Sequence, residues 1–210
     1  RYVRKRLMAH GVASESIVVV PNFIDPATQA PQAAPAPCGP VRRVVVVSRA
    51  DRIKRLDLLV DAVRSQPALR AIAFDVLGSG EELEALRRAA ADLPNVTFHG
   101  YVDDVPQRLA DADLLVHTCP EEPFGLAILE AFHAGVPVLV PDAGGAAELV
   151  RPGVNGWRYA AGNAAALAEA LVALAATGAP QRQDVAEAAR QVLRERYSPE
   201  AVAPVLWRLA

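Results

Sequence analysis

Residues 113–140 read DLLVHTCPEEPFGLAILEAFHAGVPVLV, two short apolar stretches on either side of a segment with helical spacing. The stretches at 113–117 and 136–140 have the length of buried strands, and the apolar residues of 124–134 recur every three to four positions. A strand, a helix and a second strand in this order are typical of a parallel sheet that is covered by helices. This stretch therefore predicts an α/β fold.

The same alternation continues on both sides of this stretch. It predicts a doubly wound, Rossmann-like parallel sheet, in which ligands bind beyond the carboxyl ends of the strands. We expect strands at 43–48, 72–77, 95–98, 113–117, 136–140 and 156–159. We expect helices at 55–64, 80–92, 105–110, 124–134, 146–150, 164–176, 184–196 and 199–209.

The ends of the chain have a different pattern from its centre. Residues 1–11 are typical of the end of a helix, and the β-branched run at 16–21 predicts a short strand. Repeated proline and alanine predict an extended linker over 26–41. We therefore divide the chain into a tail of a preceding domain (1–25), this linker, a central domain (42–180) and C-terminal helices (181–210). We expect those helices, with Tyr197 and Trp207, to cross back towards the preceding N-terminal domain and to leave an apolar patch exposed.

Composition excludes several classes of function. The 22 basic and 24 acidic residues are mixed and give a net charge of -2, so no broad cationic surface is available for nucleic acid. The two cysteines, Cys38 and Cys119, lack the spacing of a disulfide framework or a zinc site. No apolar run approaches the roughly 20 residues that span a bilayer. We expect a cytoplasmic protein.

Two loops at the predicted strand ends suggest contact with phosphate. Residues 49–55 carry four cations, which can bind a diphosphate or can simply form a solvated loop. The glycines of 77–81 can admit a ligand or can serve a tight turn. In the loop at 100–104, Asp103 is expected to cap the next helix.

The loop before the central helix is the most informative. The free amides of Phe124, Gly125 and Leu126 predict an anion site at the helix start. Glu130 interrupts an otherwise apolar helix face. Because an unpaired buried carboxylate is costly, Glu130 must either pair with a cation or accept hydrogen bonds from ligand hydroxyls.

Several of these motifs resemble family 4 of the retaining glycosyltransferases. The paired glutamates of EPFGLAILE and the following AFHAGVPV resemble the family signature. The segments SRADRIK, LGSGEE, NVTFHGYV and GGAAELVRPGVNGW resemble further family segments in the same order, from about residue 41 to 176, and VVVPNFID resembles the crossover that precedes them. The resemblance implies the C-terminal, donor-binding half of the GT-B architecture, in which two Rossmann-like domains face each other across a cleft.

The resemblance also implies roles for individual residues. Arg49 and Lys54 would neutralise the diphosphate of a nucleotide sugar and, with Glu122 on the transferred sugar, form the catalytic set. Glu130 would accept the ribose hydroxyls. The remaining substrate contacts would come from the backbone of Tyr101 and Val102 beside the base and from Phe124, Gly125 and Leu126 at the sugar or its phosphate.

The same resemblance implies a retaining transfer of a hexose from UDP-sugar or GDP-sugar. The acceptor, a glycan, lipid or small molecule, would be held by an N-terminal domain that could also touch a membrane surface, so this half alone should transfer little. Because cations stabilise the leaving group and we see no D-x-D motif of the kind that metal-dependent transferases use, we expect no metal and no cofactor.

Two departures from the family pattern leave alternatives open. Ser48 and Arg55 stand where the family usually has glycine. A nucleotide-sugar epimerase of the same architecture and a domain that binds nucleotide sugar without catalysis are the alternatives. The four scattered histidines are expected to be packed or surface residues rather than bases.

Overall fold

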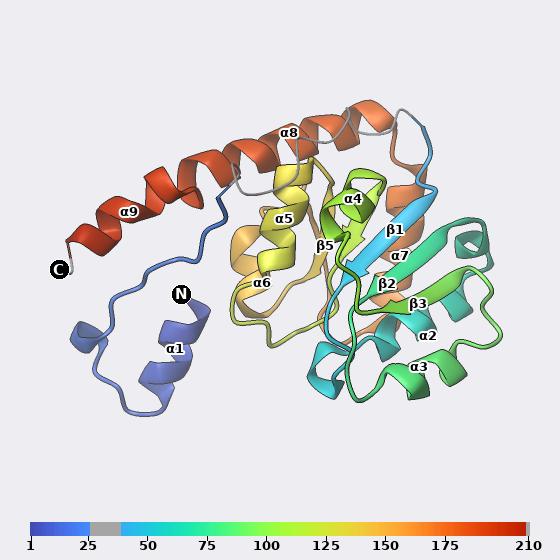
Figure 1. Cartoon of the computed structure of the whole chain (residues 1–210), viewed down its shortest axis with the longest axis horizontal. Coiled ribbons are helices and arrows are strands. Elements are labelled where there is room, and N and C mark those ends of the chain that lie inside the picture. The colour runs from blue at the N-terminus through green and yellow to red at the C-terminus, as the bar shows by residue number, and fades with distance from the viewer. Residues whose placement is uncertain (26–38, 209–210) are drawn as a thin grey trace.

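The structure is a computed structural model that describes residues 1–25 and 39–208. Six parallel strands form one sheet in the order β3-β2-β1-β4-β5-β6 (Figure 1). They are β1 (Arg43–Val47), β2 (Ala73–Leu77), β3 (Val96–Gly100), β4 (Leu114–Val116), β5 (Val138–Pro141) and β6 (Trp157–Tyr159). The strand order reverses direction between β1 and β4, which is the position where doubly wound sheets bind their ligands.

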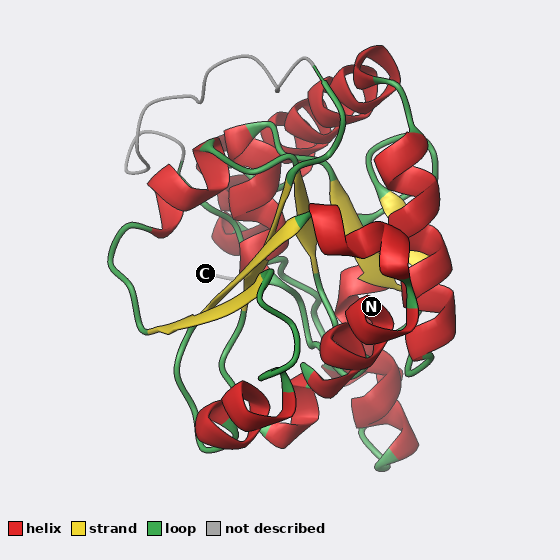
Figure 2. Ribbon diagram, turned by 90° about the vertical axis from the view of Figure 1, so that its right-hand side faces the viewer, coloured by secondary structure: helices red, strands yellow, loops and turns green. Residues whose placement is uncertain are grey.

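Helices cover both faces of this sheet (Figure 2). The longer ones are α1 (Tyr2–Ala9), α2 (Asp57–Ser65), α3 (Leu83–Ala89), α4 (Val105–Ala110), α5 (Leu126–Ala134), α6 (Gly144–Leu149), α7 (Ala164–Ala176), α8 (Ala179–Arg196) and α9 (Pro199–Trp207). Short 3-10 turns occupy Ser14–Ser16, Arg52–Lys54 and Pro67–Ala71. The α/β fold class and all six strands of the central domain are confirmed.

Alternate residues of β1 enter two separate cores. Val44 and Val46 pack with α2, α3 and α7 on one face, whereas Val45 packs with α4, α5, α6 and α8 on the other. Because successive side chains of a strand point to opposite faces, a strand buried on both sides is apolar throughout. This explains the unbroken run of valines at 44–47.

The strand expected at 16–21 is wrong. The chain makes a 3-10 turn at Ser14–Ser16 and then runs extended without pairing to any described strand. Val18 and Val19 remain 58% and 41% exposed. β-branched residues favour extended backbone, but a strand also needs a neighbour, and this segment passes beside α6 and α8 instead of a sheet edge.

The C-terminal helices form a long arm. Figure 1 shows α8 and α9 running across one end of the molecule and past the sheet. α8 begins at Ala179, with Pro180 in its first turn, so the boundary expected at residue 181 falls inside this helix. Trp207 is 80% exposed, as expected, whereas Tyr197 is buried.

The linker and the absence of a membrane-spanning segment can be compared with the structure only for the described residues. Most of the linker expected at 26–41 lies outside the described residues, which resume at Gly39. Within the described part, no single helix has the length and apolar character needed to cross a membrane. α7 together with the α8–α9 segment reaches those limits only as a pair bent by 111°.

Candidate functional site

The loops after β1 and β4 meet at the point where the strand order reverses. Lys54 Nζ lies 2.7 Å from a carboxylate oxygen of Glu122, and both side chains are mostly buried, with exposed fractions of 17% and 14%. The Thr118 hydroxyl donates to the backbone oxygen of Lys54 at 2.6 Å. The thiol of Cys119 donates to that of Ile53 at 3.3 Å. Residues 49–55, the cationic turn, and the loop that leads into α5 are therefore held together.

Glu122 is ionised within this cluster. Burial by itself raises the pKa of its carboxyl, but the hydrogen bond from Lys54, the charge of Lys54 and the neighbouring His117 and Phe124 amide together hold that pKa below its usual value. The pair thus presents one cation and one anion at the edge of the sheet, and a polar ligand can bind to each of them.

The helix expected to start at Phe124 begins two residues later. Gly125 occupies the N-cap with φ 103°, a left-handed conformation that glycine adopts without strain, and α5 starts at Leu126. The first turn of a helix leaves its amides without intrahelical partners. The amides of Gly125 and Leu126 can therefore still meet an anion, whereas the Phe124 amide already supports Glu122.

The other three cations of residues 49–55 lie apart from Glu122. Arg49 is 73% exposed and pairs with Asp51 at 2.8 Å, and Arg52 is exposed. Arg55 has φ 53°, the one left-handed residue other than glycine in the described part of the chain, and its guanidinium is held by Asp57 at 2.9 Å. The left-handed backbone at this position explains why a glycine is usual there in the family that the sequence resembles. Arg55 adopts the same backbone conformation.

Glu130 lies on α5 and is partly buried. It forms no hydrogen bond or ion pair with any described residue. Burial alone raises the pKa of its carboxyl. Of the two expectations for Glu130, pairing with a cation is therefore wrong, and the carboxylate is left for another hydrogen-bond donor.

The two glycines of the loop after β2 serve backbone packing. A Cβ on Gly78 would lie 2.1 Å from the backbone oxygen of Ser48, and one on Gly80 would lie 2.6 Å from that of Ala50. These glycines let the loop after β2 press against the cationic turn. Of the two interpretations of these glycines, the tight turn therefore applies. Their contribution to the site is to hold the backbone of residues 48–51 in place.

A second pair of glycines, Gly144 and Gly145, supports the Glu122 loop, a contact that the sequence did not predict. The Gly145 amide donates to the backbone oxygen of Glu122 at 2.5 Å. A Cβ on Gly145 would lie 2.0 Å from the backbone oxygen of Pro123. The two glycines follow β5 after two intervening residues, but the sequence alone does not reveal which backbone approaches them.

Replacing Gly145 by alanine should therefore move the Glu122 loop. We expect a loss of about 1–3 kcal/mol in the free energy of unfolding, the usual cost of overpacking, together with weaker ligand binding. Chemical denaturation measures the first effect. Gly178→Ala is the matched control, because its Cβ would meet only a proline side-chain carbon at 3.8 Å. Equal stability of the two variants would contradict the role given to Gly145.

The loop after β3 differs from expectation. Tyr101 is 75% exposed, and a hydrogen bond with Asp103 raises the pKa of its hydroxyl. Asp103 does not cap α4, because the N-cap residue is Asp104 and no side chain caps this helix. Val102 is partly buried against the second core. Asp103 prefers Tyr101 to the helix amides, so the capping role is wrong.

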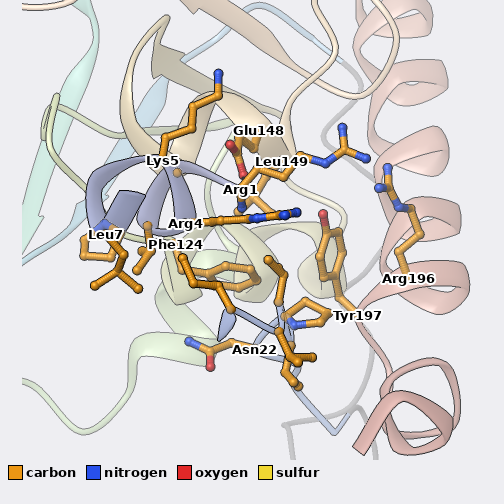
Figure 3. Close-up of a pocket in the computed structure, with 18 residues that line it drawn as sticks. Arg1, Arg4, Lys5, Leu7, Asn22, Phe124, Glu148, Leu149, Arg196 and Tyr197 are labelled. Atoms are coloured by element: carbon orange, nitrogen blue, oxygen red, sulfur yellow. The ribbon is translucent and has the colours of Figure 1, made fainter. Parts of the chain in front are cut away.

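A cavity of about 660 Å³ opens beside this site, between the N-terminal segment and α8. Figure 3 shows Phe124 and Tyr197 among the residues that line it, with Arg1, Arg4 and Arg196 nearby. The rings of Phe124 and Tyr197 meet edge to face with centroids 5.8 Å apart. Phe124 and Gly145 thus adjoin both the cavity and the Glu122 loop.

The histidines differ in their surroundings. His99 Nε2 lies 2.6 Å from Asp75, and the exposed His10 ring contacts the backbone oxygen of Arg6. His117 is only 4% exposed, and burial lowers its pKa to about 4, so the ring is neutral at pH 7. His117 is packed as predicted, but it also faces Glu122, which the sequence does not reveal.

Comparison with known proteins identifies the family to which this chain belongs. A family model described as "Glycosyl transferases group 1" matches residues 41–177, well over half of the chain. The chain belongs to the group 1 glycosyltransferases. The matched range holds the three loops that follow β1, β2 and β4 as well as α5, so the family assignment covers every loop of the candidate site.

Individual relatives of this chain are also glycosyltransferases. It is 30% identical to a phosphatidyl-myo-inositol mannosyltransferase of Mycobacterium leprae over 91% of the chain and 52% of the relative. It is 32% identical to the lipopolysaccharide core biosynthesis glycosyltransferase LpsE of Rhizobium meliloti over 78% of the chain and 48% of the relative. The chain thus spans about half the length of these curated relatives.

Solved structures of other proteins share the fold. The crystal structure of HepE from Anabaena in complex with UDP-glucose superposes with a TM-score of 0.86, at 25% identity, over 98% of this chain and 60% of HepE. Sucrose-phosphate synthase from Thermosynechococcus elongatus superposes with a TM-score of 0.82 over 99% of this chain and 55% of the synthase, at 22% identity.

Proposed function

We propose that this chain is the donor-binding half of a retaining glycosyltransferase and binds a nucleotide-diphosphate sugar at the junction of the β1 and β4 loops. The observation that carries the proposal is the Lys54–Glu122 pair at 2.7 Å in front of the α5 N-terminus, with an unpartnered Glu130 on the same helix. Lys54 and the free amides at the start of α5 suit a phosphate, Glu122 suits a sugar hydroxyl, and Glu130 suits the ribose hydroxyls.

The phosphate end of the donor would lie between Lys54 and α5. Lys54 can turn from Glu122 to a phosphate oxygen, and Arg49 can leave its exposed pair with Asp51, because surface ion pairs contribute only about 0–1 kcal/mol. The amides of Gly125 and Leu126 add the positive end of the helix dipole. This arrangement suits a leaving diphosphate.

The sugar and nucleoside would follow the remaining polar groups. Glu122 is suited to hold a hydroxyl of the transferred sugar once Lys54 turns to phosphate, and Glu130 is suited to accept both ribose hydroxyls. The exposed Tyr101 and the backbone of Val102 would border the base. UDP-glucose in the HepE complex supports a UDP-sugar donor, and the mannosyltransferase relative supports a hexose.

The chemistry would be a transfer with retention, assisted electrostatically. Negative charge develops on the departing diphosphate, and Lys54, Arg49 and the helix amides would stabilise it. No metal is needed if these cations neutralise the leaving group. The acceptor, a glycan, lipid or small molecule, would be held by the half that the relatives have in addition. We propose that the reaction takes place in the cytoplasm.

Calorimetry with UDP, GDP and ADP tests donor binding by this chain. We expect one of them to bind, with the same affinity in EDTA as in magnesium, because the binding cations are side chains. Absence of binding by all three would favour a domain that has lost the donor. In a protein that carries both halves, conversion of the donor to its epimer without transfer would favour the epimerase instead.

A further inference from the structure

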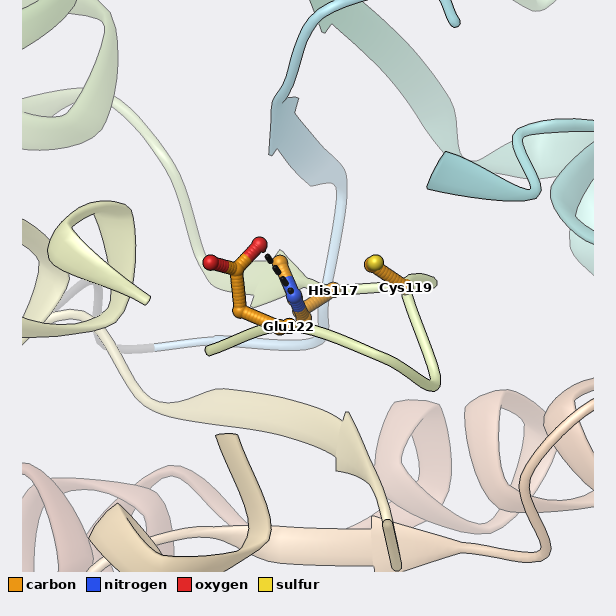
Figure 4. Close-up of side chains that lie close together, drawn as sticks. All are labelled: His117, Cys119 and Glu122. Carbon is orange, nitrogen blue, oxygen red and sulfur yellow. Dashed lines mark ion pairs between the residues drawn. The ribbon is translucent and has the colours of Figure 1, made fainter. Parts of the chain in front are cut away.

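Three side chains with metal-binding atoms converge at the end of β4. The ligand atoms of His117, Cys119 and Glu122 all lie within 4.8 Å of one another. Figure 4 shows the His117 ring between the thiol and the carboxylate. The ring nitrogen Nε2 is 3.6 Å from a Glu122 oxygen. The three residues come from one short loop, so the backbone that holds them is continuous.

His117 supplies the observation that points to a ligand. Its side chain is 5% exposed, and Nε2 has no hydrogen-bond partner among the described residues. A buried polar atom without a partner is rare in folded proteins and calls for an explanation. The Glu122 carboxylate, at 3.6 Å, lies just beyond hydrogen-bond distance of this nitrogen.

We propose that His117, Cys119 and Glu122 form a binding site for a borderline-soft divalent ion such as Zn²⁺, and that this ion opposes donor binding. Nitrogen, sulfur and oxygen ligands together suit zinc or cobalt rather than magnesium. Bond lengths of about 2.0–2.3 Å place tetrahedral ligands about 3.6 Å apart. His117 and Glu122 already have that separation, so Cys119 alone must approach by up to about 1 Å.

Metal binding would compete with the Lys54–Glu122 pair. Cys119 binds as the thiolate and releases its proton to solvent, and Glu122 exchanges the ammonium of Lys54 for the metal ion. Thiolate and carboxylate then balance the two charges of the ion. Lys54 and Glu122, which contact the donor in the proposed function, are no longer available together. The metal site stands without that function, whereas the antagonism rests on it.

Cobalt titration of the reduced, chelator-treated chain tests the site. We expect a thiolate-to-cobalt charge-transfer band that saturates at one equivalent. Cys119→Ser should lower cobalt affinity by more than about 100-fold, since loss of even an outer-shell partner costs about 10- to 100-fold. Cys38→Ser should keep the band. His117→Gln should weaken binding, and the exposed His10→Gln should not. A missing band, or one that survives in Cys119→Ser, would overturn the site.

A competition experiment then tests the antagonism. Zn²⁺ should weaken binding of the nucleotide diphosphate to the unmodified chain, and EDTA should restore it. Zn²⁺ should leave unchanged whatever nucleotide affinity Cys119→Ser has. Equal or tighter nucleotide binding with Zn²⁺ would overturn the antagonism. If no nucleotide binds without metal, the proposed function fails, and the cobalt spectrum still decides the metal site. Folding of each variant is checked by circular dichroism.

Discussion

Replacing Lys54 by alanine should weaken nucleotide diphosphate binding by roughly 10- to 150-fold, because a hydrogen bond to a charged group contributes about 1.5–3 kcal/mol. Lys54 is the cation of this turn whose side chain reaches Glu122, in the loop that leads into α5. Its loss also leaves the buried Glu122 carboxylate without its closest counter-charge, so some loss of stability should accompany the loss of affinity. Calorimetry gives the affinity, and thermal unfolding gives the stability.

Arg52→Ala is the matched control for Lys54→Ala. It removes the same charge from the same turn, but Arg52 is exposed. If a general positive potential attracted the nucleotide, both variants would lose affinity to a similar extent. If Lys54 contacts the diphosphate directly, Lys54→Ala should lose much nucleotide affinity and Arg52→Ala should lose little. Similar losses would refute the placement of the diphosphate beside α5.

Replacing Glu130 by glutamine should lower nucleotide affinity and raise stability at the same time. The carboxylate is partly buried without a partner, so its charge costs folding free energy that a ligand would recover. We expect about 1.5–3 kcal/mol less binding energy, the range for hydrogen bonds to a charged group, and about 1 kcal/mol more stability. Calorimetry and chemical denaturation measure the two effects.

Two comparisons make the Glu130 test specific. The native chain should prefer a ribonucleotide to its 2′-deoxy analogue, and Glu130→Gln should lose most of that preference. Glu169→Gln, an exposed position on α7, should change neither quantity. A Glu130→Gln variant that keeps its preference for ribose would show that the hydroxyls bind elsewhere.

The raised pKa of Glu130 gives these effects a pH dependence with a definite sign. The folded chain binds this proton more tightly than the unfolded chain, so the stability cost of Glu130 is present at neutral pH and disappears as the pH falls below the usual carboxyl pKa. The stability difference between the native chain and Glu130→Gln should therefore shrink on acidification. Ribose-dependent affinity of the native chain should fall as the carboxyl becomes protonated.

Much of the fold could be predicted from hydrophobic periodicity. The valine run of β1 and the apolar runs around α5 are typical of strands in a sheet covered on both faces, and these residues do enter two cores. Periodicity fails where pairing matters, as at Val18 and Val19, because a β-branched run does not show whether a neighbouring strand exists. It also misplaced the start of α5, where the left-handed Gly125 ends the loop.

The candidate site could be predicted only as far as single segments allow. Glu130 stood out because a carboxylate on an apolar helix face needs a partner, and its pairing state required coordinates. The Lys54–Glu122 contact joins residues 68 positions apart, and spacing within one segment cannot reveal it. His117 and Cys119 lie in the loop between β4 and α5, but their convergence depends on how this loop turns.

The central claim is that a nucleotide-diphosphate sugar binds between the cationic turn after β1 and the start of α5. A crystal structure of the chain with bound UDP or GDP, whichever binds in calorimetry, tests it most directly. The account predicts the diphosphate beside Lys54 and the amides of Gly125 and Leu126, with both ribose hydroxyls on Glu130. A nucleotide lodged in the cavity beside Tyr197, with Lys54 still paired to Glu122, would contradict it.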